Sequence, residues 1–391
     1  MSFIGGVCAF TGIYLILPKD DTSDPTPVQE SETVVAHAPQ TTPESEPIIE
    51  EEAEDETILP TPTSTPSEQE EPHSVTDFLL GGQAIHGGIP HAEQMHDAEM
   101  AWVKLQAFDI TYDFNDSIKN VHSNGFRILV SFRDEANKSR VTSPDYQQEM
   151  LQYLTTLASQ GADAIEVWNE PNIDREWPAG QISGASYTQL LQQAYQQIKA
   201  TNPDTIVISG ALAPTGFFGG VCTPNGCDDK PFLEEIVAAG ALDFMDCIGI
   251  HYNEGILPPG ATTGDPRGNS EHYTRYYQKM VDTYLEVTGG SKPLCFTELG
   301  YLAGDEYPDL ATTSPTFSWA SNTTIEQQST WLGEAVDLAM ASNGQVRMII
   351  VFNVDIETSG ADPQSGYAIV RPNGSCPACE TLANTINAAN P

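Results

Sequence analysis

Over residues 76–391, short apolar stretches rich in β-branched residues alternate with longer amphipathic stretches. The clearest amphipathic stretch is 187–200, where Tyr187, Leu191 and Ile198 fall on one face of a helix. The apolar stretches have the length and composition of buried strands. Eight strands are predicted, at 78–86, 103–111, 127–132, 164–168, 205–211, 247–252, 293–297 and 348–352.

Strands that alternate with helices form a parallel sheet covered by helices. Eight such units in about 300 residues favour an α/β fold of the (β/α)₈ or TIM-barrel type over an open sheet. No glycine-rich phosphate-binding sequence follows the first predicted strand, which argues against a dinucleotide-binding fold. The other predicted helices lie at 145–159, 231–239, 272–287 and 324–342, the last with Thr324 as its N-cap.

The chain begins with an apolar stretch of a different kind. Residues 3–17 are almost wholly apolar, and their length lies between that of a signal-peptide core and that of a short transmembrane helix. No Lys or Arg precedes this stretch, and no small-residue cleavage site follows it. We expect residues 1–18 to be a membrane anchor or an export signal, and a buried helix of the domain is the alternative.

Residues 19–75 have the composition of a linker. They contain no aromatic residue and no glycine, and they are rich in Pro, Thr, Ser and Glu. Such a segment cannot bury enough apolar surface to offset the entropy lost on ordering, and its prolines and like charges keep it extended. We expect a disordered spacer that holds the domain of residues 76–391 at a cell surface, with a tail of no particular function as the alternative.

Charge excludes some partners. The chain has 55 acidic and 16 basic residues and a formal net charge of −39. No basic stripe is present to neutralise phosphates, so nucleic acid is excluded as a partner. Anionic lipids and polyanionic substrates are disfavoured for the same reason.

The cysteines indicate an oxidising compartment. Two close pairs lie in predicted loops, Cys222 with Cys227 and Cys376 with Cys379. Such pairs predict local disulfides, and a four-cysteine zinc site is the alternative. Cys247 and Cys295 lie within apolar stretches and are expected to be buried thiols.

Two glutamates lie where a barrel would carry its chemistry, at the carboxyl ends of strands. Glu170 follows the fourth predicted strand, and Glu298 ends the seventh. These strands face one another across a barrel, so both side chains can reach one cavity. Hydrolysis of a glycosidic bond needs such a pair, one acid to protonate the leaving oxygen and one carboxylate to attack the anomeric carbon. This chemistry requires no metal and no cofactor, and we expect none.

The sequence WNEPN at 168–172 resembles the acid/base motif of clan A glycoside hydrolases, and TELG at 297–300 resembles their nucleophile strand. The likeness extends over residues 76–391 and includes the cellulase-like family 5 and the xylosidase-like family 39. It implies a retaining double displacement, with Glu170 as the general acid/base and Glu298 as the nucleophile. It also implies that Asn169 binds the sugar 2-hydroxyl.

The same resemblance extends to the sixth strand, where His251 and Tyr252 match the His and Tyr of the clan. We expect Tyr252 to donate a hydrogen bond to Glu298, although adjacent residues of a strand point to opposite faces. The clan commonly has a tryptophan at the end of strand eight, where this chain has Phe352 and Asn353. Asn353 is nevertheless a predicted substrate-binding residue.

Further residues are assigned by their position. Arg133, at the end of strand three, is expected near the nucleophile, with a surface salt bridge as the alternative. Glu166 should share a face with Trp168 and Glu170 and point into the barrel below the site. We expect it to be structural, because a buried carboxylate needs partners, which Lys104 and Arg127 would supply.

Aromatic loop residues are the second indication of a sugar ligand, because sugar rings pack on aromatic faces. Trp177 follows strand four and Trp319 follows strand seven. Each is expected to bind substrate, and packing within its own loop is the alternative. Trp168 and Trp177 would also provide the partly apolar surroundings that raise the pKa of an acid catalyst.

Taken together, these features predict a monomeric, exported and cell-tethered retaining O-glycosyl hydrolase acting on a poly- or oligosaccharide. The alternative is a catalytically silent barrel that binds glycans at the cell surface. An intact Glu170/Glu298 pair favours the enzyme, because a silent relative can lose either glutamate.

Overall fold

The computed structural model describes residues 78–389 except residues 86, 224, 359 and 361. The predictions for residues 1–18 and 19–75 lie outside this part of the chain. Its elements alternate between strand and helix from β1 to α9, so the α/β class is confirmed.

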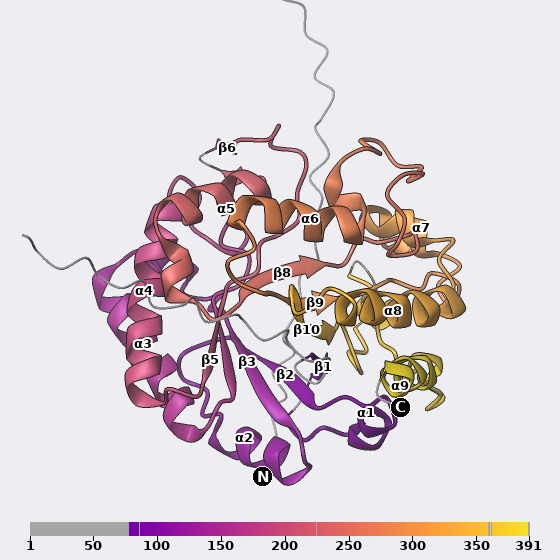
Figure 1. Ribbon diagram of the computed structural model, residues 1–391, viewed down its shortest axis with the longest axis horizontal. Coiled ribbons are helices and arrows are strands. Elements are labelled where there is room, and N and C mark those ends of the chain that lie inside the picture. The colour runs from indigo at the N-terminus through magenta and orange to yellow at the C-terminus, as the bar shows by residue number, and fades with distance from the viewer. Residues whose placement is uncertain (1–77, 86, 224, 359, 361, 390–391) are drawn as a thin grey trace, which may run out of the picture. The chain divides into compact units, whose positions relative to one another are not determined.

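Eight parallel strands form the central sheet, in the order β5-β4-β3-β2-β1-β10-β9-β8. Bridges from Ile208 to Cys247 and from Leu212 to Ile250 join β5 to β8 and bring the sheet close to a complete barrel. Each of the eight predicted strands is present, and the TIM-barrel prediction is confirmed (Figure 1). The strands are β1 Leu79–Gln83, β2 Trp102–Ala107, β3 Arg127–Phe132, β4 Ala164–Val167, β5 Ile206–Ser209, β8 Ile248–Tyr252, β9 Leu294–Leu299 and β10 Val346–Val351.

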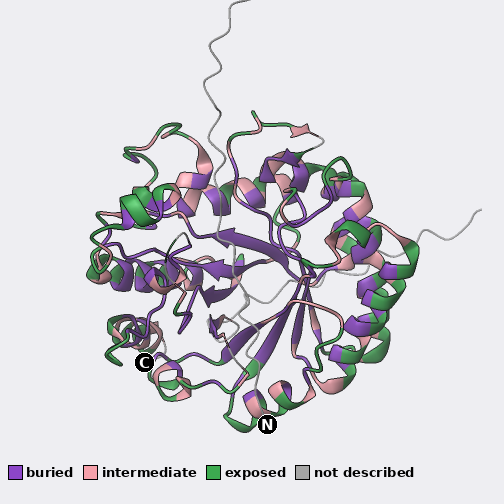
Figure 2. Cartoon of the chain, turned by 180° about the vertical axis from the view of Figure 1, so that it is seen from behind, coloured by how far each residue is buried: buried purple, intermediate pink, exposed green. Residues whose placement is uncertain are grey.

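Helices follow the strands and surround the barrel, with their outer faces exposed (Figure 2). They are α1 Ala92–Asp97, α2 Asn115–Ser123, α3 Pro144–Gln160, α4 Gly184–Thr201, α5 Asp229–Ala238, α6 Tyr277–Thr288, α7 Leu310–Thr313, α8 Ile325–Met340 and α9 Pro377–Ala389. Short 3₁₀ turns lie at Lys138–Arg140, Ala241–Phe244, Tyr273–Arg275, Pro315–Ala320 and Gln364–Gly366.

Local signals explain where the predicted helices begin and end. Helix α8 starts with a capping box, in which Thr324 and Gln327 each bond the other's backbone NH. Helix α3 has Pro144 in its first turn and ends at Gly161, which adopts the left-handed conformation that glycine tolerates best. The pattern missed α1, α2, α7 and α9, and the first three of these are short, with six, nine and four residues.

The apolar residues form two main layers. A larger cluster fills the space between strands and helices, and it includes Trp331 and Leu190. A smaller cluster lies inside the barrel and includes Trp102, Leu129 and Met348. The barrel closes tightly at the β5–β8 seam, where a Cβ on Gly249 would lie 2.1 Å from the carbonyl oxygen of Ser209. Glycine is therefore required at this seam.

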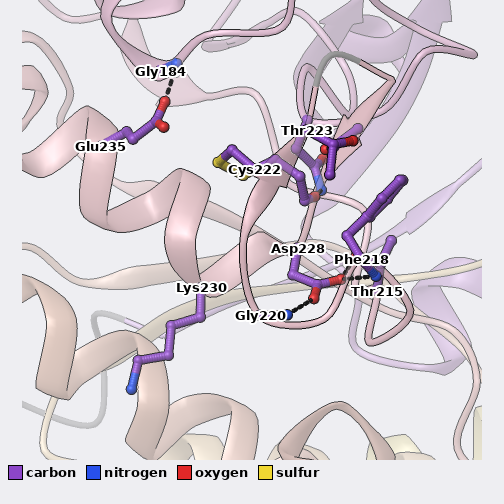
Figure 3. The surroundings of a disulfide bond; sticks show 12 residues. Gly184, Thr215, Phe218, Gly220, Cys222, Thr223, Asp228, Lys230 and Glu235 are labelled. Carbon is purple, nitrogen blue, oxygen red and sulfur yellow. Dashed lines mark hydrogen bonds between the residues drawn. A yellow bond between two sulfur atoms is a disulfide. The ribbon is translucent and has the colours of Figure 1, made fainter. Parts of the chain in front are cut away.

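Three disulfides link the six cysteines in the described residues, and two of them confirm the predicted pairs. The bond from Cys222 to Cys227 closes the small β6–β7 hairpin of Cys222–Thr223 and Gly226–Cys227 (Figure 3). The bond from Cys376 to Cys379 lies at the start of α9 rather than in a loop.

The prediction of two buried thiols was wrong, because Cys247 and Cys295 form a disulfide inside the barrel. They are 48 residues apart in sequence, and the pairing of β8 with β9 brings them together. Three disulfides fit an extracellular location. Within the described residues, no helix combines the length and the apolar character needed to cross a membrane.

Candidate active site

The two predicted glutamates lie at the carboxyl ends of β4 and β9 and line one pocket. Strand β4 stops at Val167, and Trp168 and Glu170 then adopt positive φ angles of 74° and 42°. Non-glycine residues pay for this conformation with backbone strain, and such strain gathers at functional sites. The strained turn ends the strand alternation at the point where Glu170 enters the pocket.

Glu298 is held by groups from β2 and from the end of β8. Lys104 Nζ of β2 donates to Glu298 Oε1 over 2.9 Å, and Asn253 Nδ2 just beyond β8 donates to Glu298 Oε2 over 2.9 Å. Burial alone would raise the pKa of Glu298, but the charges of His251 and Lys104 outweigh it and lower the pKa below its ordinary value. The surroundings of Glu298, which is 8% exposed, therefore favour its ionised form.

Glu170 has a different environment. Its Oε2 pairs with the guanidinium of Arg175, and its Oε1 lies 3.1 Å from His251 Nδ1. Burial would raise the pKa of Glu170, but Arg175 and His251 outweigh it and lower the pKa to about 2. The expectation of a raised pKa is thus contradicted for this state of the site. The physical reason is the guanidinium, which the loop after β4 places on the carboxylate.

His251 connects the two carboxylates. Its Nδ1 lies 3.1 Å from Glu170 Oε1 and 3.8 Å from Glu298 Oε2. These two oxygens therefore cannot be farther apart than the sum of these distances. Burial would lower the pKa of His251, but Glu298 and Glu170 outweigh it and raise the pKa. The two carboxylates therefore favour the protonated form of the imidazole that lies between them.

The pocket is mainly polar, with an aromatic part. Its volume is about 620 Å³ when the open space at its mouth is included. Three aromatic residues, Phe317, Phe352 and Tyr367, line the pocket, and all three belong to one apolar cluster. Amide side chains from strand ends and loops also line the pocket. They are Gln83, Gln106, Asn169, Asn253 and Gln364. Hydroxyl-rich rings with apolar faces suit such a wall.

Two further predicted residues lie in this pocket. Asn169 is buried, and its Oδ1 accepts no hydrogen bond from any described residue. Arg133 also lines the pocket, but its Nη1 is engaged 2.6 Å from Glu176 Oε1, and it also pairs with Glu135. Arg133 therefore forms the salt bridge expected as the alternative. It also lines the same pocket as Glu170 and Glu298.

The prediction that Tyr252 donates a hydrogen bond to Glu298 is wrong. Tyr252 points outward to Tyr277, and its hydroxyl donates to the carbonyl oxygen of Arg275 over 3.2 Å. Because side chains alternate along a strand, His251 and Asn253 share the inward face instead. Asn253 makes the bond that had been assigned to Tyr252.

Trp177, Trp319 and Asn353 do not line the pocket. Trp177 is buried in the outer core beside Trp168, and its indole NH donates to the carbonyl of Gln181. Trp319 packs near Phe317 with Arg267 over its ring. The amide of Asn353 is used by its own loop, donating to the Gln364 carbonyl and accepting from the NH of Ile356. Both tryptophans pack within their own regions, and substrate binding by the partly exposed Trp319 stays a prediction.

Glu166 lies inside the barrel, as expected. Its Oε2 is 3.7 Å from Lys104 Nζ, and its Oε1 accepts hydrogen bonds from Thr297 Oγ1 and from the NH of Ala211. Lys104 is thus confirmed as a partner, whereas Arg127 lies over the ring of Trp102 instead. Trp168 does not share the face of Glu166, because its left-handed φ turns it into the outer core.

Several site residues were missed. Lys104 contacts Glu298 as well as Glu166, and a lysine within the apolar stretch WVKLQA was a visible signal for a buried ion pair. Arg175, Glu176 and Asp362 lie in loops, where no sequence periodicity indicates the direction of a side chain. No group of three or more potential metal ligands occurs among the described residues.

Comparison with known proteins finds similar folds only. No protein-family profile and no curated protein sequence matches this chain. Three solved structures share the fold. They are an endo-1,4-β-mannanase from Rhizomucor miehei (12% identity, TM-score 0.50, covering 80% of this chain and 95% of that one), a β-galactosidase from the psychrophilic Marinomonas ef1 (10%, 0.52, 80% and 60%) and a GH10 xylanase with a bacterial Ig-like domain from termite gut (14%, 0.50, 82% and 79%).

The structural likeness establishes the barrel fold, whereas identities of 10–14% leave the family open. All three neighbours are named as glycoside-cleaving enzymes. The structural neighbours of this chain are thus glycoside hydrolases, and its place in family 5 or family 39 stays a prediction from the two motifs.

Proposed function

We propose that this protein is a retaining glycoside hydrolase that cleaves O-glycosidic bonds of a poly- or oligosaccharide. The observation that carries the proposal is the pair of buried carboxylates, Glu170 and Glu298, which end facing strands of the barrel in one polar pocket. Glycosidase folds among the structural neighbours agree with it. Fold alone does not imply function, so the argument rests on the pair.

In the proposed reaction, Glu298 attacks the anomeric carbon while Glu170 protonates the leaving oxygen. This step breaks the glycosidic bond and forms a glycosyl ester on Glu298. In the second step, Glu170 removes a proton from water, which attacks the same carbon and releases Glu298. Asn169 offers its free Oδ1 as an acceptor for a sugar hydroxyl.

The spacing of the pair is compatible with retention. Retaining pairs lie about 5–5.5 Å apart and inverting pairs about 6.5–9.5 Å apart. The oxygens on either side of His251 Nδ1 are separated by no more than the sum of 3.1 Å and 3.8 Å. This upper limit admits the retaining spacing and overlaps the short end of the inverting range, so retention is proposed on the motifs as well.

The proposal includes an extracellular location for the barrel. Three disulfides support an extracellular domain, and residues 1–18 and 19–75 would act as its anchor or export signal and its spacer. The protein would act as a monomer on glycans at the cell surface. A silent glycan-binding barrel is the weaker candidate, because it has no use for the buried ion pairs around both glutamates.

Turnover on a panel of polysaccharides tests the function. The purified protein should release reducing sugar from at least one member of a panel of β-glucan, mannan, xylan and galactan. Glu298→Gln removes the nucleophile and should lower turnover on that substrate by about 10⁴-fold or more. Binding of a glycan without release of sugar by the wild type would support the silent barrel instead.

A further inference from the structure

The proposed acid cannot act in the arrangement that the structure shows. Both oxygens of Glu170 are engaged, Oε2 by the guanidinium of Arg175 and Oε1 by His251 Nδ1. A general acid must present a proton on one of these oxygens to the leaving group. A carboxylate in contact with a guanidinium binds a proton poorly, because both charges favour the ionised form. Arg175 must therefore leave Glu170 before the bond breaks.

The surroundings of Arg175 allow this movement. Arg175 lies on the loop between β4 and α4, and its side chain is 28% exposed. Its second contact is Glu176, at 3.3 Å from Nε. Glu176 also pairs with Arg133 Nη1 at 2.6 Å, so it keeps a charged partner when Arg175 moves away.

A second carboxylate is available in the same pocket. Asp362, in the loop between β10 and α9, is 7% exposed and lines the pocket together with Arg175. Its Oδ1 accepts from Gln364 Nε2 over 2.6 Å, whereas its buried Oδ2 accepts no hydrogen bond from the described part of the chain. A buried carboxylate oxygen without a partner is costly, so Asp362 has an open position for a donor.

We propose that Arg175 is a positioning residue with two carboxylate partners, Glu170 in the arrangement described here and Asp362 once a sugar occupies the site. The inference rests on the proposed function, because it describes how its acid is made ready. When the guanidinium moves to Asp362, Glu170 is left buried with His251 and takes up one proton from water. That proton then passes to the leaving oxygen.

Electrostatics agree with this geometry. Burial raises the pKa of Asp362 to about 6, against the opposing effects of Gln364 and Arg175. Asp362 is thus charged near neutral pH and within electrostatic reach of Arg175. The other ionisable groups that interact with Glu170 are His251 from β8, Glu254 from the loop after β8, Glu298 from β9, Arg133 from the end of β3 and Glu176 from its own loop.

A double-mutant cycle in the full-length protein tests the switch. Asp362→Asn removes the second partner, so Arg175 stays on Glu170 and kcat falls by about tenfold or more. In an Arg175→Gln background there is no guanidinium to release, so adding Asp362→Asn should change kcat by less than about twofold. Equal losses in both backgrounds would overturn the switch and assign Asp362 to direct contact with the sugar.

The pH profile gives a second readout. Arg175→Gln should move the basic limb of kcat/KM to higher pH, because Glu170 then holds its proton more tightly. Arg175→Lys keeps the charge and should restore most of the wild-type profile. Arg140→Gln, which removes an exposed arginine paired with Glu149, is the matched control and should leave the profile unchanged.

Carbon-13 NMR of the glutamate carboxyls separates failure of the switch from failure of the function. Glu170, assigned through Glu170→Gln, should titrate near the pKa of about 2 in wild type and higher in Arg175→Gln. An ordinary glutamate pKa in an active wild-type enzyme would overturn the switch alone. Absence of hydrolysis on every panel substrate would overturn the proposed function and the switch with it.

Discussion

The two glutamates of the pocket are held in different ways. Glu298 ends β9, and its partners Lys104 and Asn253 belong to β2 and the end of β8. Glu170 follows a strained turn, and its charged partner Arg175 lies five residues further along the same loop. Strands of a closed barrel hold their side chains in place, whereas loops can rearrange. The comparison teaches that Glu298, the proposed nucleophile, has its partners on strands, whereas Glu170, the proposed acid, depends on a charged partner in a loop.

The largest effect should come from removing the fixed partner. Lys104→Met leaves Glu298 and Glu166 buried without their ammonium group, so the protein should lose about 3–5 kcal/mol of unfolding free energy. Turnover should fall by about 10²–10³-fold, because Glu298 loses a stabilising charge. Urea unfolding and steady-state kinetics measure the two effects.

The pH dependence of Lys104→Met sharpens the comparison. Glu298 must be ionised to attack, and Lys104 helps to lower its pKa. Without Lys104 the pKa of Glu298 rises, so the acidic limb of kcat/KM moves to higher pH. An unchanged acidic limb would show that Glu298 is not the group ionising there.

Removing the acid should have a smaller effect that depends on the substrate. Glu170→Gln should lower turnover of natural glycans by about 10²–10⁴-fold, because their leaving groups need a proton. Aryl glycosides with good leaving groups should keep their first step, and azide should restore the second. Burst kinetics with and without azide measure this, and loss of the first step without rescue by azide would contradict the assigned role.

The smallest effect should come from the N-terminal segment. Deleting residues 1–75 removes no residue of the pocket, so activity should be unchanged. The melting temperature should shift by less than about 2 °C, which corresponds to roughly 1 kcal/mol in a domain of this size. A drop of several degrees would show that the apolar stretch at 3–17 packs on the domain.

The barrel was predictable because its strands are continuous apolar stretches, and Glu170 and Glu298 were predictable because strand ends carry the chemistry of this fold. Strand alternation alone favours Asn253 over Tyr252 as the partner of Glu298. The Cys247–Cys295 bond could not be predicted, because it depends on the pairing of β8 with β9. Arg175 was missed because its contact with Glu170 depends on a loop conformation that no sequence period encodes.

The stereochemistry of the first product tests the central claim most directly. Proton NMR during the first minutes of hydrolysis shows the anomer that the enzyme releases, before mutarotation mixes the two forms. Direct attack by Glu298 and a second displacement by water predict the same anomeric configuration as in the substrate. Initial release of the opposite anomer would contradict the account, because Glu298 would then activate a water instead of forming a bond to the sugar.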